Sequence, residues 1–286
     1  MVTVAMVSPG AMGSALGRGY AEAGARVVAT VAGRSARTRE LAAGIELLPS
    51  LEEVVAAADV VISIVPPGDA LHVADQVATA AQAAGVQPLY ADFNAIAPAT
   101  VARIATAISP LPFVDGSISG GPPNLPGTRL YLSGRDSAAV AALAHPRLNV
   151  VELPGDVGTA SAVKMSTASV YKGVSALLLQ ALRAAEANGV LDPVVEDLTS
   201  GYPELMHRLA PRLASSASKA HRFVGEMHEI ALAQGAAGLT PDLFTAVAAV
   251  YQEVAGTALG DRTPEQAREL TELLDVLRLL KPGRSR

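Results

Sequence analysis

Apolar and polar residues follow two different patterns along this chain, and the change from one to the other falls near residue 159. Before it, short apolar runs rich in β-branched residues are separated by amphipathic segments, a pattern that predicts strands alternating with helices. The expected strands are 2–7, 26–31, 45–47, 59–65, 88–93 and 113–115, and the expected helices are 14–24, 38–43, 51–57, 69–84 and 99–108. This alternation predicts a doubly wound parallel α/β sheet, whose ligands bind at the carboxyl ends of its strands.

Beyond residue 159 the strand pattern ends and only helical spacing remains. The expected helices are 160–188, 193–199, 203–213, 216–233, 241–258 and 264–280. We therefore expect two domains, a Rossmann domain over residues 1–158 and an all-α domain over residues 159–286. Because so many Ala- and Leu-rich helices cannot all bury their apolar faces in one small bundle, we expect a homodimer that shares the helical domains. The tail, 281–286, is expected to be frayed.

Composition narrows the classes of protein that fit. The 286 residues are 50% hydrophobic and include no cysteine, which excludes disulfides and thiolate metal sites. A net charge of −5 without a long basic run argues against general nucleic-acid binding. No apolar run approaches the roughly 20 residues that span a bilayer, and the first strand begins too early to leave room for a cleavable presequence. We expect a soluble cytoplasmic protein that binds neither membrane nor nucleic acid, and the five histidines lack metal-ligand spacing.

A glycine turn joins the first strand to the first helix. In a dinucleotide-binding turn, one glycine lets the backbone approach a pyrophosphate and a later one lets the helix pack on the strand. Gly10 and Gly13 hold these two places, whereas Ser8 stands where a further glycine is usual. The alternative is an ordinary glycine turn of an α/β domain. The expected cofactor contacts here are Ser8, Pro9, Gly10, Ala11 and Met12.

The end of the second strand indicates which dinucleotide is bound. In this fold a carboxylate there binds the ribose 2′-hydroxyl of NAD, whereas basic residues accommodate the extra phosphate of NADP. The segment carries two guanidiniums and no acid before Glu40, which favours NADP over NAD. The alternative is a solvated loop with Ser35 as the N-cap of the next helix. The expected phosphate contacts are Gly33, Arg34, Ser35 and Arg37.

Four motifs, in order, resemble those of the β-hydroxyacid dehydrogenase and 6-phosphogluconate dehydrogenase superfamily, which also includes the imine reductases. They are the turn at 8–13, Gly33-Arg34-Ser35, Ser119-Gly120-Gly121, and Gly155-x-x-Gly158 followed by Lys164. The resemblance implies an NADP-dependent reductase or dehydrogenase in which residues 119–121 hold a substrate carboxylate and Lys164 transfers a proton. Val65, Pro66 and Asn94 lie at or just after the ends of expected strands, at the same sheet edge, and complete the expected cofactor contacts.

The chemistry of these residues is consistent with those roles. Ser-Gly-Gly exposes backbone N–H groups and a hydroxyl to an anionic oxygen, although a plain loop would use the same residues. Lys164 has apolar neighbours, and a partly desolvated lysine can exchange protons with an alcohol, although its side chain can equally extend to solvent. The superfamily's asparagine four residues after the lysine is Ala168 here, so Tyr171 or Lys172 is expected to supply a replacement donor. The segment 164–173 most resembles a branch with a phosphogluconate-dehydrogenase-like C-terminal domain.

A charged stripe on the predicted helix 216–233 offers further candidates. Arg222, Glu226 and Glu229 recur at helical spacing, which is typical of a solvated face. In the resembled branch this segment approaches the nicotinamide, so His221, Arg222 and Glu226 are kept as substrate-binding candidates. The leading hypothesis is hydride transfer between NADPH and a C=O or C=N carbon of a small anionic substrate. The rival hypothesis is a non-catalytic NADP-binding redox sensor, which Ala168 and Ser8 favour.

Overall fold

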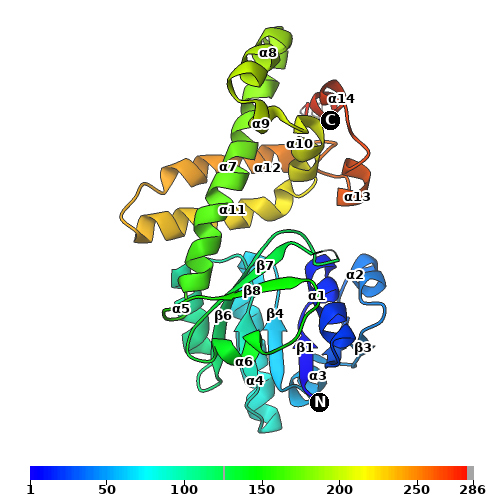
Figure 1. The fold of residues 1–286 in the computed structure, drawn as a ribbon, viewed down its shortest axis with the longest axis vertical. Helices are drawn as coiled ribbons and strands as arrows, with labels where there is room; N and C mark the ends of the chain where they lie inside the picture. Colours follow the sequence, from blue (N-terminus) through cyan, green and yellow to red (C-terminus); the bar gives the residue numbers. More distant parts are fainter. Residues whose placement is uncertain (125, 282–286) are drawn as a thin grey trace. The chain divides into compact units, whose positions relative to one another are not determined.

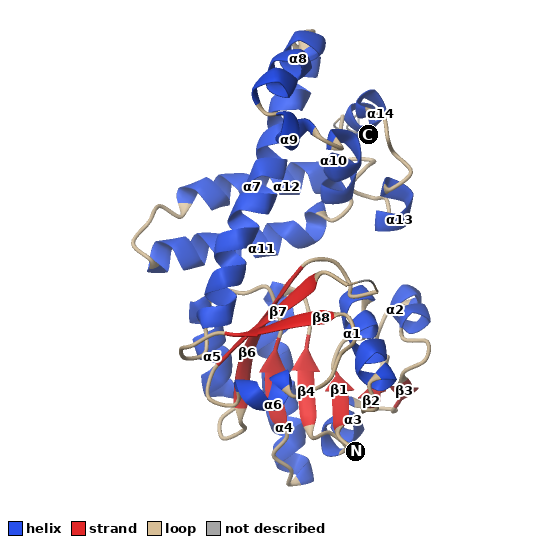
Figure 2. Ribbon diagram, in the orientation of Figure 1, coloured by secondary structure: helices blue, strands red, loops and turns tan. Residues whose placement is uncertain are grey.

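The chain folds into two compact units. The computed structural model describes residues 1–124 and 126–281, and the units are Met1–Met165 and Ser166–Arg286. Their boundary falls inside one long helix, α7 (Thr159–Ala187), which belongs to both (Figure 1). In the part of the chain that the structure describes, every strand lies in the first unit, and the second unit is helical (Figure 2).

The first unit is built on one eight-stranded sheet in the order β3-β2-β1-β4-β5-β6-β7-β8. The strands are β1 (Thr3–Met6), β2 (Arg26–Ala29), β3 (Glu46–Leu47), β4 (Val60–Ser63), β5 (Leu89–Asp92), β6 (Phe113–Ser119), β7 (Thr128–Ser133) and β8 (Leu148–Glu152). The predicted doubly wound α/β fold is confirmed. The sheet is not wholly parallel, however, because β6 and β7 pair antiparallel. The strands β7 and β8 were not predicted, and β6 is four residues longer than the predicted 113–115.

Helices cover both faces of the sheet and explain why strands such as β1 and β4 carry apolar side chains on both faces. The helices of this unit are α1 (Ala11–Glu22), α2 (Ala36–Leu41), α3 (Leu51–Ala56), the 3₁₀ turn η1 (Pro67–Asp69), α4 (Ala70–Ala84), α5 (Pro98–Ala107) and α6 (Ser137–Ala141). Alternate residues of β1 enter two separate cores. Val4 and Met6 pack with Leu16 of α1, whereas Ala5 packs with Val73 of α4 on the opposite face. A strand buried on both faces needs such a continuous apolar run.

The second unit follows the predicted helices with two breaks. Its helices after α7 are α8 (Leu191–Gly201), α9 (Pro203–Met206), α10 (Leu209–Ala217), α11 (Ala220–Ala236), α12 (Asp242–Ala255), α13 (Pro264–Ala267) and α14 (Leu273–Leu279). The predicted helix 203–213 is interrupted where Arg208 adopts the left-handed φ of 50°, which a continuing helix excludes. The predicted helix 264–280 is likewise two short helices, the first of which begins with a capping box at Thr263. None of the described helices has the length and apolar character that crossing a bilayer requires.

The chain's end is only partly described. Lys281 pairs with Glu186 at 2.8 Å, and the rest of the tail that we expected to be frayed, residues 282–286, lies outside the described residues.

The two glycines of the β1–α1 turn differ in what a side chain at each position would meet. A Cβ at Gly13 would lie 2.3 Å from the carbonyl oxygen of Ser8, so the helix approaches the strand more closely than any other residue allows. Gly10 is the N-cap of α1, and a Cβ there would meet no atom within 4 Å. Gly13 is therefore required for packing, whereas Gly10 faces open space.

This difference predicts opposite outcomes for two alanine substitutions. Gly13→Ala should lower the free energy of unfolding by about 1–3 kcal/mol, because the turn must move to admit the methyl group. Gly10→Ala, the matched control, should change it by less than about 1 kcal/mol. Urea unfolding followed by circular dichroism measures both values. Equal stabilities for the two variants would contradict the assignment of Gly13 to packing.

Candidate active site

The start of α1 presents a set of backbone donors. Because the N-cap is glycine, no side chain caps the first turn of α1, and Ser14 N donates to the Gly10 carbonyl at 2.8 Å to begin the helix. Unpaired first-turn N–H groups and the positive end of the helix dipole favour an anion. With the open space at Gly10, this turn fits a diphosphate.

The turn after β2 has a structural role of its own. Gly33 takes the left-handed φ of 68°, and Ser35 caps α2 by accepting a hydrogen bond from Thr38 N at 3.2 Å. The capping role of Ser35 is thus confirmed. Arg34 and Arg37 lie on either side of this cap. Arg34 is half-buried and Arg37 is exposed.

Asn94 is buried, and its side chain fixes the loop that follows β4. Its Oδ1 accepts from Val65 N at 2.6 Å, and its Nδ2 donates to Asp92 at 2.8 Å and to Ser63 at 3.2 Å. Asn94 therefore holds in place the loop that carries Val65 and Pro66. Sequence reasoning gave Asn94 a direct cofactor contact and missed this supporting arrangement.

Asp92 is the buried carboxyl of this cluster. Burial raises the pKa of Asp92 from 3.8 to about 7, although the hydrogen bonds from Asn94 oppose the shift. Between these pH values the folded protein holds a proton that the unfolded chain has released. The contribution of Asp92 to stability therefore declines as the pH rises through this range.

The Ser-Gly-Gly segment begins within the sheet instead of forming a loop from residue 116. Strand β6 continues through Ser119, which pairs with Arg129 of β7. Gly116 looks like a loop residue in the sequence, but its missing side chain admits the ring of Phe93, which a Cβ would approach to 2.3 Å. The strand ends at Ser119, and the next residue, Gly120, has a φ of 125°.

Lys164 comes to the same strand end. It lies in the second turn of α7, and its Nζ donates to the carbonyl oxygen of Ile118 at 2.6 Å. The lysine side chain is half-buried. The structure therefore brings the ammonium of Lys164 next to residues 119–121. The sequence motifs had assigned Lys164 to proton transfer and residues 119–121 to carboxylate binding.

The candidates of the second unit are not equivalent. Lys172, which is half-buried, forms an ion pair with Glu226, and its Nζ lies 4.3 Å from the centroid of the Phe223 ring. The expectation that the charged stripe is a solvated face is wrong for Glu226, which is only 6% exposed. By contrast, Tyr171 is 71% exposed, and His221 and Arg222 are also exposed.

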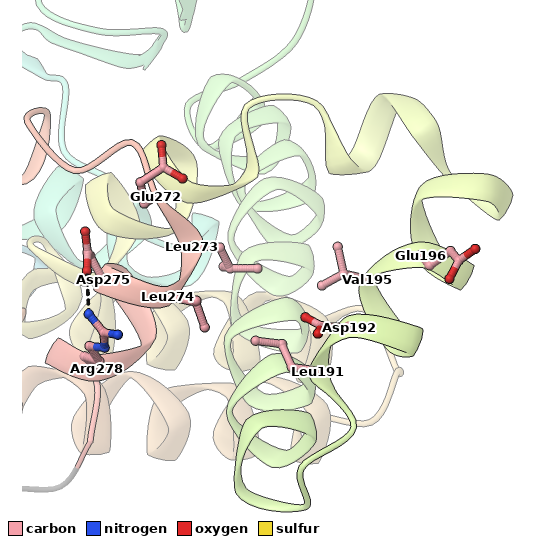
Figure 3. Close-up of a pocket in the computed structure, with 9 residues that line it drawn as sticks. All are labelled: Leu191, Asp192, Val195, Glu196, Glu272, Leu273, Leu274, Asp275 and Arg278. Atoms are coloured by element: carbon pink, nitrogen blue, oxygen red, sulfur yellow. Dashed lines mark hydrogen bonds and ion pairs between the residues drawn. The ribbon is translucent and has the colours of Figure 1, made fainter.

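A groove between α8 and α14 is the wrong place for an anionic substrate. It encloses about 530 Å³ and is lined by both apolar and acidic side chains (Figure 3). Its only basic side chain, Arg278, pairs with Asp275 at 3.1 Å. The lining residues are Leu191, Asp192, Val195, Glu196, Glu272, Leu273, Leu274, Asp275 and Arg278. None of them is a candidate from the sequence motifs, and the described residues contain no group of three or more His, Cys, Asp or Glu that could hold a metal ion.

Comparison with known proteins covers both units. Residues 3–148 match the family described as the NAD binding domain of 6-phosphogluconate dehydrogenase. Residues 185–254 match a family described as a domain of unknown function (DUF1932). An uncharacterized 28.5 kDa protein of Methanothermus fervidus is 29% identical over 170 residues, which cover 59% of this chain and 65% of that protein. The match therefore spans less than two thirds of that relative.

Solved structures resemble the chain over most of its length. A conserved protein of unknown function, described as structurally similar to 3-hydroxyacid dehydrogenases, is 32% identical with a TM-score of 0.65, over 89% of this chain and 97% of that one. A 3-hydroxyisobutyrate dehydrogenase of Mycobacterium tuberculosis shares the fold at 21% identity and a TM-score of 0.69, over 94% of this chain and 98% of that one. The chain belongs to the family of the 6-phosphogluconate dehydrogenase NAD-binding domain, within the oxidoreductase superfamily that its four motifs resemble.

Proposed function

We propose that this protein transfers a hydride between NADPH and the C=O or C=N carbon of a small anionic substrate. The observation that carries the proposal is the position of Lys164, whose Nζ lies 2.6 Å from the Ile118 carbonyl oxygen at the end of β6. A proton donor is thereby held beside Ser119, Gly120 and Gly121, which can bind a carboxylate through a hydroxyl and backbone N–H groups.

The chain's own residues fit the cofactor at three places. The turn 8–12 and the uncapped start of α1 would hold the diphosphate, and Arg34 and Arg37 would bind the phosphate on the adenosine ribose. The loop of Val65 and Pro66, which Asn94 fixes, would hold a further part of the cofactor. NADPH supplies the hydride, and the protein orients it and moves the proton.

Proton movement is the task of Lys164. The Ile118 carbonyl accepts an N–H of the ammonium and so fixes Nζ at the end of β6, beside residues 119–121. In reduction Lys164 gives a proton to the atom that gains negative charge, and in oxidation it takes the proton back. Tyr171 is the better replacement for the superfamily's asparagine, because Lys172 is engaged by Glu226.

The exposed apolar side chains of the helical unit support the homodimer. Val170 and Leu177 of α7 are 61% and 69% exposed and lie on one side of the helix, since seven residues make nearly two turns. Leu243 of α12 is also largely exposed. We propose that a second copy of this chain covers these side chains.

The first prediction from the proposed function concerns cofactor choice. NADPH should bind more tightly than NADH, and Arg34→Asp should weaken NADPH binding by about 1.5–3 kcal/mol, because a bidentate phosphate contact is lost and a like charge is introduced. Titration of NADPH fluorescence measures the dissociation constants. Arg39→Asp, which makes the same charge change on the exposed side of α2, is the control and should have a much smaller effect. Equal affinity of the unaltered protein for NADPH and NADH would overturn the preference.

The second prediction concerns proton transfer. With any carbonyl or imine from a substrate panel that oxidises NADPH, Lys164→Ala or Lys164→Met should lower the single-turnover rate about 10²–10⁴-fold, because a positioned proton donor is removed. The affinity for NADPH should change little, since Lys164 faces the reacting carbon. A variant that keeps more than about a tenth of the rate would move proton transfer to Tyr171, Lys172 or His221. NADPH binding without turnover of any panel member would favour the redox sensor.

The third prediction concerns assembly. Light scattering at micromolar concentration should give about twice the 29.1 kDa chain mass. Leu177→Glu should shift the protein towards the monomer, because it places a charge in the covered apolar face. Gln82→Glu adds a negative charge at an exposed position of α4 in the first unit, which does not carry these side chains, and serves as the control. A monomeric unaltered protein that stays monomeric at high concentration would exclude the homodimer.

A further inference from the structure

A fully buried carboxylate ties the start of α7 to the sheet. Asp115 of β6 has no exposed surface, and its Oδ2 accepts from Gly158 N at 2.8 Å, Ser161 N at 3.0 Å and Ser133 Oγ at 3.0 Å. Its Oδ1 accepts from Ser161 Oγ at 2.6 Å. All four donors belong to β7 or to the first residues of α7 and the glycine before it.

Two serines complete the attachment. Ser133 of β7 accepts from Ala160 N at 3.0 Å, and Ser117 of β6 donates to the Ala160 carbonyl at 2.7 Å. The first N–H groups of a helix have no partner within the helix, and a negative charge there also favours the helix dipole. The start of α7 is thus satisfied by side chains from the sheet.

The remote origin of this cap matters. A helix is usually capped by the residue just before it, which stabilises the helix without attaching it to anything else. Here the preceding residue is Gly158, which has no side chain, and the capping carboxylate comes from 43 residues earlier. Because this cap belongs to β6, it also fixes the position of the start of α7 along β6.

The same face of α7 carries Lys164. Ser161 and Lys164 are three residues apart and are neighbours on one side of the helix. Asp115, Ser117 and Ser119 are every second residue of β6 and therefore lie on one face of the strand. Asp115, which binds the start of α7, is thus only three residues from Ile118, whose carbonyl binds Lys164. The helix therefore meets β6 at two points, first through Asp115 and then through Lys164 Nζ at the Ile118 carbonyl.

We propose that Asp115 is a positioning residue that sets the rotation and height of α7 on β6, so that Lys164 Nζ is held at the Ile118 carbonyl beside residues 119–121. The catalytic consequence rests on the proposed function of Lys164, whereas the anchoring does not. Asp115 is buried beneath the helix start and acts on the reaction only through the position of Lys164.

The anchoring can be tested without a substrate. Asp115→Asn keeps the shape of the side chain but turns one acceptor into a donor that faces N–H groups. Amide hydrogen exchange of the peptide 158–165 should become faster by about tenfold or more, because buried donors lose their acceptor. Acetylation of Lys164 by acetic anhydride at neutral pH, read by mass spectrometry, should rise roughly fivefold as Nζ leaves the carbonyl.

Two further variants make the result decisive. Ser161→Ala removes only the hydroxyl that binds Oδ1 and should shift both readouts in the same direction by a smaller factor. Asp156→Asn removes an exposed carboxylate from the same approach to α7 and should leave both unchanged. A folded Asp115→Asn protein with unchanged exchange and unchanged Lys164 acetylation overturns the proposal. If Asp115→Asn does not fold, unchanged acetylation in Ser161→Ala overturns it.

Turnover then separates this proposal from the proposed function. Asp115→Asn should lower the single-turnover rate and displace its pH profile while leaving the dissociation constant of NADPH unchanged, since the cofactor contacts lie elsewhere. If Lys164→Ala retains full turnover while Asp115→Asn still raises Lys164 acetylation, the anchoring stands and the catalytic assignment of Lys164 falls. If Lys164→Ala abolishes turnover while Asp115→Asn alters neither acetylation nor the pH profile, the reverse holds.

Discussion

The buried start of α7 imposes the constraint on which the candidate site depends. Backbone N–H groups inside a protein must find acceptors, and those of Gly158, Ala160 and Ser161 find them on β6 and β7. Satisfying these groups from the sheet places the second turn of α7 beside the end of β6. Lys164 reaches the Ile118 carbonyl as a result. The charged group of the site is thus located by the hydrogen-bonding needs of a helix end.

Two buried carboxyls sit side by side in the sheet and are used differently. Asp92 of β5 and Asp115 of β6 are partners in the parallel register, and the charge of Asp115 adds to the effect of burial in raising the pKa of Asp92 to about 7. Asp92 is bonded by Asn94, which fixes the loop after β4. Asp115 is bonded by groups from β7 and the start of α7. These two neighbouring carboxyls therefore fix two parts of the candidate site, the loop after β4 and the start of α7.

Much of the first unit could be predicted from local patterns, and the exceptions have physical causes. Strands buried on both faces, such as β4, appear as continuous apolar runs, and Gly13 is explained by packing against Ser8. Strand β7 alternates buried and exposed residues, a period-two signal that we did not use, whereas the partly exposed edge strand β8 gives a weaker one. Gly116 was misleading because a glycine that admits an aromatic ring looks like a turn glycine.

The polar contacts were the least predictable part. Glu226 looked solvated because its partner, Lys172, lies 54 residues away in the chain. Asp115 has donors 18 to 46 residues further on, so no local pattern reveals its role. An acid inside an otherwise buried strand was nevertheless a signal, because a buried charge is tolerated only where several donors converge on it.

The shared helix limits how far the two units can be treated as modules. A fragment ending at residue 158 would contain every strand of the sheet, yet it would remove Ala160 and Ser161 and leave Asp115 buried with only part of its donor set. An underpaired buried carboxylate is strongly destabilising, so the nucleotide-binding unit would lose stability although its sheet was intact. Exchange of helical domains between relatives should therefore succeed only at junctions beyond the first turns of α7. In this architecture the position at which the two units can be separated lies inside a helix and not in a loop.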